Sequence, residues 1–215
     1  MAMNQGEQFW IGWSVQLAIA VATFGAVLVA LFGDWIRARL FKPHLSLALV
    51  SPVGESTTLQ VVSPSGDSPT EKARFYHVRV SNKVPWPKAS QVQVYLIRVE
   101  EPGPDGALQV KWASDVPIKW KFQEINPLVR TVGPAADCDL CSVVKDKWLE
   151  LHPLIVPNNL ARIVRRREAV DMVVNLEARS NEATSFIKRF RISWDGKWED
   201  GDTEMTHHLV VKEIT

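Results

Sequence analysis

Hydrophobic residues form one long run near the start of this chain and short alternating segments after it. The run covers residues 9–32 and contains no charged residue. A helix of that length rises roughly 35 Å, which is enough to cross a hydrocarbon core about 30 Å thick. The pattern predicts a short tail over 1–8, a transmembrane helix over 9–33 and a juxtamembrane linker over 34–43.

From residue 44 onward the alternation of apolar and polar residues is typical of strands. Strands are expected at 44–50, 58–62, 75–82, 91–100, 108–112, 118–122, 140–144, 148–156, 169–179, 184–194 and 207–214. Turn residues predict two hairpins, one joining 91–100 to 108–112 and one joining 169–179 to 184–194. Of these eleven candidate segments, roughly seven to nine are expected to form strands, with no amphipathic helix of any length after the apolar run. The chain is therefore predicted to be mainly β, with an antiparallel, immunoglobulin-like β-sandwich over 44–215.

The alternation also assigns side chains to faces. Tyr76, Val78 and Val80 are expected on one face of their strand, and His77 and Arg79 on the other. In the next strand Val92, Val94 and Leu96 share one face and Tyr95, Ile97 and Val99 the opposite one.

Two parts of this pattern resemble a known kind of protein. Residues 76–82, Ala89 and residues 92–96, together with residues 190–194 and Trp198, resemble the core of immunoglobulin-like domains in small bacterial single-pass membrane-anchored proteins of unknown function. That resemblance implies a binding or assembly role and provides no catalytic residues. The prolines at 85 and 87 depart from it, because such domains usually have small residues at this bend.

The flanks of the apolar run indicate its orientation. The indole rings of Trp10, Trp13 and Trp35 are expected at the two headgroup levels of the bilayer. The basic residues Arg37, Arg39 and Lys42 follow the apolar run. The positive-inside rule therefore predicts a single-pass protein of the inner (cell) membrane, with its N-terminus outside the cell membrane and its C-terminal domain in the cytosol. A cleaved signal peptide is disfavoured because residues 1–8 contain no Lys or Arg.

Small residues recur every fourth position within the run, at Ser14, Ala18, Ala22, Ala26 and Ala30. Such a stripe lets two helices approach closely in lipid, so it predicts a homo-oligomer. Alanine is also common in any anchor, which is the alternative explanation.

Charge and cysteine content restrict the classes of function that the chain could have. The net charge of +1 on 215 residues argues against a bulk nucleic-acid binder. Cys138 and Cys141 are the two cysteines, which suits a reducing compartment. Their CxxC spacing could hold a metal ion or form a redox pair. A metal site would need further ligands and a redox pair a helix that the CxxC opens, and the sequence predicts neither nearby. Two small strand residues are therefore the preferred interpretation.

Two charged clusters remain. The basic residues are Arg162, Arg165, Arg166, Arg167, Lys188, Arg189 and Arg191. They could bind anionic lipid headgroups or a small nucleotide-like anion, or form a solvated face paired with Glu168, Asp171 and Glu177. The acidic residues are Asp195, Glu199, Asp200, Asp202 and Glu204. They do not follow a known calcium-loop spacing and are interpreted as a solvated hairpin loop.

No catalytic, metal-binding or cofactor-binding motif is predicted, and an enzyme is the least favoured class. The sequence predicts a membrane-anchored, non-enzymatic module that recruits a protein partner at the bilayer and self-associates through its helix. The alternative is a ligand-gated membrane effector that senses a small anionic ligand or anionic lipid through the basic cluster.

Overall fold

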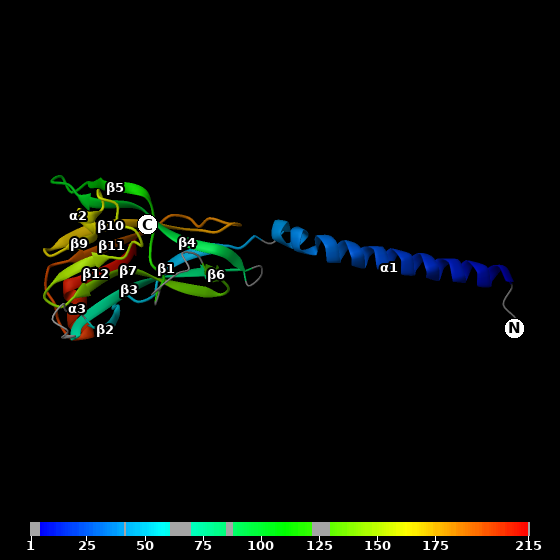
Figure 1. The fold of residues 1–215 in the computed structure, drawn as a ribbon, viewed down its shortest axis with the longest axis horizontal. Helices are drawn as coiled ribbons and strands as arrows, with labels where there is room; N and C mark the ends of the chain where they lie inside the picture. The colour runs from blue at the N-terminus through cyan, green and yellow to red at the C-terminus, as the bar shows by residue number, and fades with distance from the viewer. Residues whose placement is uncertain (1–4, 41, 61–69, 85–87, 122–129, 215) are drawn as a thin grey trace. The chain divides into compact units, whose positions relative to one another are not determined.

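The computed structural model describes residues 5–40, 42–60, 70–84, 88–121 and 130–214. The chain divides into two compact units, residues 1–42 and 43–215 (Figure 1). The first unit is a single helix, and the second is built almost entirely of strands.

Helix α1 runs without interruption over Gln5–Leu40. Its window Gln16–Gly33 has a mean hydropathy of 2.1 and no buried residue, so by length and composition it could cross a bilayer. Residues 34–40, predicted to belong to the juxtamembrane linker, continue the helix as far as Leu40. Residues 34–40 contain good helix formers and no Gly or Pro. The helix ends before Pro43, because proline disfavours helical geometry in the residue before it.

The second unit consists of two antiparallel sheets of six strands each within the described residues. The first has the order β1 (Leu45–Leu49), β3 (Thr70–Asn82), β7 (Ala135–Val144), β8 (Trp148–Leu151) and β9 (Arg165–Arg166), with β2 (Glu55–Gln60) also paired to β3. The second has the order β12 (Leu209–Ile214), β11 (Lys188–Trp194), β10 (Val170–Arg179), β4 (Ala89–Pro102) and β5 (Leu108–Pro117), with β6 (Arg130–Val132) also paired to β4. The predicted hairpins are confirmed as β4–β5 and β10–β11.

Two short helices interrupt the strands, α2 (Ala161–Val164) and α3 (Asp202–His208). The expectation of a plain hairpin loop is wrong at α3. Acidic side chains lie in its first turn and histidines in its last, which suits the helix dipole. Met205 anchors it in the core. About two helical turns are too short to show a periodicity in the sequence.

The inner faces of both sheets share one hydrophobic core. The predicted inward residues Tyr76, Val78 and Val80 are fully buried, as are Val92 and Val94. These strands therefore face inward as the alternation predicts.

Val99 is the exception, because the sequence predicts it on the face opposite Val92 and Val94, and it is fully buried in the same core. The ladder shifts at Ile97: Leu96 pairs with Leu176, while Arg98 pairs with Asn175. One extra residue on β4 forms a bulge, and the residues beyond it change face.

Some predicted elements have no counterpart among the strands. Ile118 and Trp120 make isolated bridges to Pro153 and Cys138 instead of a strand, and Phe122 lies outside the described residues. The loop expected at 63–69 and the bend at 85–87 also lie outside them.

Candidate functional site

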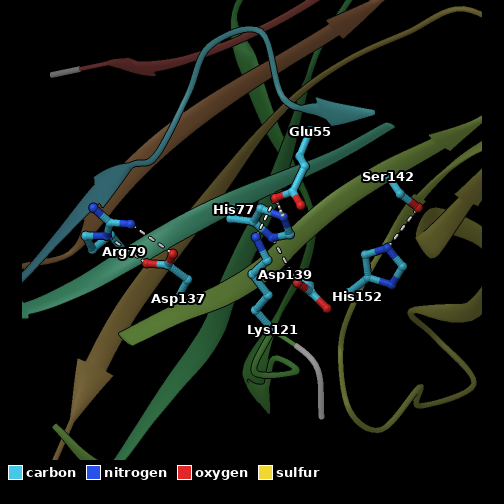
Figure 2. A network of polar contacts seen from close by, with 8 residues as sticks. All are labelled: Glu55, His77, Arg79, Lys121, Asp137, Asp139, Ser142 and His152. Carbon is cyan, nitrogen blue, oxygen red and sulfur yellow. Dashed lines mark hydrogen bonds and ion pairs between the residues drawn. The ribbon is translucent and has the colours of Figure 1, made fainter. Parts of the chain in front are cut away.

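The outer face of the first sheet carries a row of opposite charges across β3 and β7. The register places His77 opposite Asp139 and Arg79 opposite Asp137. Arg79 holds Asp137 with two hydrogen bonds of 2.8 and 3.0 Å (Figure 2). This hydrogen-bonding guanidinium keeps the pKa of Asp137 below its ordinary value. Cross-strand ion pairs of this kind fix the two strands and create a charged surface.

His77 lies at the centre of the row, buried between two carboxylates. Its Nδ1 is 2.9 Å from Oδ1 of Asp139, and its Nε2 is 3.3 Å from Oε2 of Glu55 (Figure 2). Neither Nδ1 nor this Oδ1 makes an aligned hydrogen bond.

Glu55 comes from the start of β2 and forms an ion pair with Lys121, which follows β5. The hydrogen bond from Lys121 is the main cause that lowers the pKa of Glu55. Glu55 also borders a hollow of about 260 Å³ lined by Val50, Ser51, Gly54, Glu55, Phe75 and His77. Gly54 has a φ of +77°, and a Cβ there would lie 2.9 Å from the carbonyl oxygen of Phe75. Only glycine fits this wall of the hollow without strain.

Phe75 forms the aromatic side of the hollow and stacks on two histidines. Its ring centroid lies 6.2 Å from that of His77 and 5.3 Å from that of His152. Nε2 of His152 is 2.8 Å from Oγ of Ser142 (Figure 2). Burial lowers the pKa of His152 to about 4, so its ring is neutral near pH 7.

This Ser–His pair lacks the accessibility that a nucleophile needs. Ser142 is 2 % exposed, and its hydroxyl is engaged by Nε2 of His152. The arrangement can present fixed charges, an aromatic ring and a small hollow to a partner. It does not present a reactive oxygen to a substrate.

The structure separates the predicted basic cluster into two groups on different sheets. Arg165 and Arg166 form β9 of the first sheet, and Lys188, Arg189 and Arg191 lie on β11 of the second. Five members are ion-paired: Arg165 with Glu150, Arg166 with Glu101, Lys188 with Glu213, Arg189 with Glu100 and Arg191 with Asp171. Arg162 and Arg167 are exposed. Of the acids expected as partners, Asp171 pairs within the cluster, while Glu177 pairs with Arg179 outside it.

Both cysteines of the CxxC segment are buried on β7. Burial raises the pKa of Cys138 and Cys141, so both stay protonated thiols. The interpretation of two small strand residues fits this geometry better than a redox pair, because reactivity requires the thiolate.

Three carboxylates of the acidic segment contact basic side chains of the same chain. Asp195 contacts His208 at 2.8 Å, Asp200 contacts Lys72 at 3.0 Å, and Asp202 contacts Arg74 at 2.7 Å. Within the described residues, no three His, Cys, Asp or Glu side chains are grouped to hold a metal ion.

In α1 the expected small-residue stripe lies on a continuous helix, and Ala18, Ala22, Ala26 and Ala30 are exposed. Ser14 is part of the same helix. Of the aromatic and basic flanking residues, Trp13, Trp35 and Lys42 are exposed, and Trp10, Arg37 and Arg39 lie within the helix.

Sequence reasoning placed His77 and Arg79 on one face but missed the acids opposite them. Asp137 and Asp139 alternate with the same period as His77 and Arg79, which was the available signal. It was hidden because the strand was expected to begin at residue 140, and β7 begins at Ala135. Neither the models of known protein families nor the curated proteins include a match to this chain.

Proposed function

We propose that this chain is a membrane-anchored, non-enzymatic binding module. In this proposal α1 crosses the cell membrane with its N-terminus outside, and the sandwich recruits a protein partner in the cytosol. The immunoglobulin-like relationship belongs to the same proposal, and two packed antiparallel sheets support it.

The hollow beside Phe75 and His77 is the observation that carries the binding role. Its polar groups are held in place before any partner arrives, by the contacts of Glu55 with Lys121 and of His77 with Asp139. Preorganised charges next to an aromatic wall reduce the ordering that binding requires. Glu55, half exposed at the rim, remains accessible to a partner side chain.

Burial of Ser142 and of both cysteines of β7 supports a binding role over catalysis. Ser142, Cys138 and Cys141 are each buried in the part of the chain that the structure describes. The alternative, an effector gated through the basic cluster, has less support because five of its seven side chains are ion-paired within the domain.

Membrane insertion and orientation are tested together in bacterial cells that express the full chain. Alkaline carbonate should leave the chain in the membrane pellet, and protease added outside spheroplasts should leave the sandwich intact. Release by carbonate would overturn the anchor, and digestion from outside would overturn the orientation.

The binding role is tested with a photo-crosslinking residue at Ser51, which lines the hollow. A matched probe at Ala107, exposed in the β4–β5 turn, is the control. We expect a discrete adduct from position 51 that disappears in Glu55→Gln/His77→Gln and is absent from position 107. The same adducts from both positions, or an adduct unaffected by the double substitution, would contradict the proposal.

A further inference from the structure

We propose that the loop between β10 and β11 is a second contact with the bilayer. Phe186 and Ile187 insert among lipid headgroups, and Lys83 and Lys88 face the phosphates of anionic lipids. This inference rests on the proposed function, since it requires α1 to lie in a membrane.

The loop presents an unusual apolar surface. Phe186 is 82 % exposed, which is the highest value for a large hydrophobic side chain among the described residues of the second unit. Ile187 beside it is 53 % exposed. Single exposed apolar residues are ordinary, but an adjacent aromatic and aliphatic pair at such exposure suits a headgroup layer.

The loop is built to hold these side chains outward. Ser185 is buried, donates its backbone N–H to the carbonyl of Ala178 and accepts the N–H of Ala178 on its Oγ, at 2.8 and 2.9 Å. The next ladder pair is Leu176 with Lys188. Phe186 and Ile187 therefore lie together opposite Glu177 and form a bulge. The paired residues before and after this bulge hold it in place.

The tip of the loop is fixed as well. Ser180 caps the turn by hydrogen bonds with Ala183. Glu182 accepts hydrogen bonds from the N–H and the hydroxyl of Ser90, at the start of β4. A loop with so many internal bonds presents its apolar pair at little cost in conformational entropy.

The loop lies at the end of the sandwich where the chain enters from α1. Lys83 donates its N–H to the carbonyl of His44 at 2.9 Å, and Asn181 donates to Ser90, two residues after Lys88. Figure 1 shows the orange loop and the start of β1 at this same end of the sandwich. The apolar window of α1 ends at Gly33, so residues 34–44 separate it from β1. The seven helical residues among them rise about 10 Å, and the four residues after α1 reach about 14 Å at most. The membrane surface is therefore within reach of this end.

The charges at this end favour an anionic surface. Lys83 and Lys88 are both exposed. Two acids at the same end are already engaged, Glu182 with Ser90 and Glu213 with Lys188. Apolar side chains flanked by lysines are the chemistry that binds interfaces containing anionic lipid.

The test uses the full chain in vesicles of phosphatidylcholine with or without phosphatidylglycerol, containing spin-labelled lipid as a quencher. A fluorophore is attached to Asn181→Cys, beside the loop, or to Ala107→Cys in the β4–β5 turn. Both native thiols are buried and stay unlabelled. We expect strong quenching at position 181, weak quenching at 107, and loss of the difference in Phe186→Ser/Ile187→Ser. Quenching at 181 should also fall without phosphatidylglycerol and in Lys83→Glu/Lys88→Glu.

Equal quenching at the two positions, or quenching at 181 that the serine pair leaves unchanged, would overturn this inference. Insertion of α1 is measured separately on the same vesicles by carbonate extraction. A chain that stays in the vesicles without quenching at 181 contradicts only the loop contact. A chain that carbonate releases contradicts the proposed anchor itself.

Discussion

Arg74 and Asp202 join the middle of a sheet to the short helix α3. The guanidinium of Arg74 is fully buried, and its Nη1 lies 2.7 Å from Oδ1 of Asp202 and 3.0 Å from the carbonyl oxygen of Val53. Nε and Nη2 have no hydrogen-bond partner among the described residues. A buried cation with incomplete hydrogen bonding depends on its counter-ion.

Asp202→Ala should therefore destabilise the sandwich by about 1–3 kcal/mol, less than for a wholly buried pair because Asp202 is 69 % exposed and water can partly replace it. Urea unfolding of the full chain in detergent, followed by tryptophan fluorescence, measures this change. Glu204→Ala on the same helix is the control and should shift stability by less than about 0.5 kcal/mol. Equal midpoints for both variants would show that Asp202 does not compensate the buried charge.

His152 should make the fold sensitive to mild acid. Its folded pKa of about 4 lies below the ordinary value of 6.5, so the unfolded chain binds more protons between these values. The stabilisation is complete above pH 6.5 and is lost as the pH falls toward 4. Between pH 7 and pH 5 the loss should be about 2 kcal/mol. Denaturant unfolding at the two pH values measures it.

The control for this prediction is His152→Phe, which keeps a ring against Phe75 and removes the titrating group. Its pH dependence between 7 and 5 should be flatter than that of the native chain. The carboxyl groups with lowered pKa, such as Glu55 and Asp137, lose their contribution only below their ordinary values of 4.5 and 3.8. If both proteins show the same dependence between pH 7 and 5, His152 is not the group responsible.

The sequence predicted the strands and most of their inward faces because alternation is a local signal. It failed where one extra residue enters a ladder, since a bulge depends on the partner strand and leaves no local mark. Ile97 forms such a bulge and changes the face of Val99. A second shift, between Tyr76 and His77, sets His77 opposite Asp139. The candidate site could therefore be only half predicted: His77 and Arg79 were assigned to one face, but their acidic partners depend on the register.

The bulge at Ile97 gives a direct stability test. Val99→Thr would bury a hydroxyl in the apolar core and should cost about 1–3 kcal/mol. Ile97→Thr, at a half-buried position, should cost less than about 1 kcal/mol. Denaturant unfolding of the two variants measures which of the two side chains lies in the core. Similar costs for the two variants would support the uninterrupted alternation that the sequence suggested, because Ile97 and Val99 would then share one face.

The four-residue stripe of α1 makes a prediction about assembly. In lipid, helices associate through close packing of small side chains, because burying apolar surface brings no gain over contact with lipid tails. Residues four apart form an inclined ridge, which suits a right-handed pair of helices. Ala22→Leu/Ala26→Leu would hold two backbones apart and should abolish the homo-oligomer that the stripe predicts. Sedimentation in detergent micelles and cross-linking in membranes both measure this.

Ala20→Leu/Val27→Leu is the matched control, because at 100° per residue these positions lie on the opposite side of the helix. Both control residues are exposed, as Ala22 and Ala26 are. The control variant should assemble as the native chain does. If both double variants assemble equally well, alanine in α1 reflects only the composition of an anchor. Loss in the stripe variant alone would assign self-association to this face, because the two variants have nearly the same apolar character and differ in where the bulk is placed.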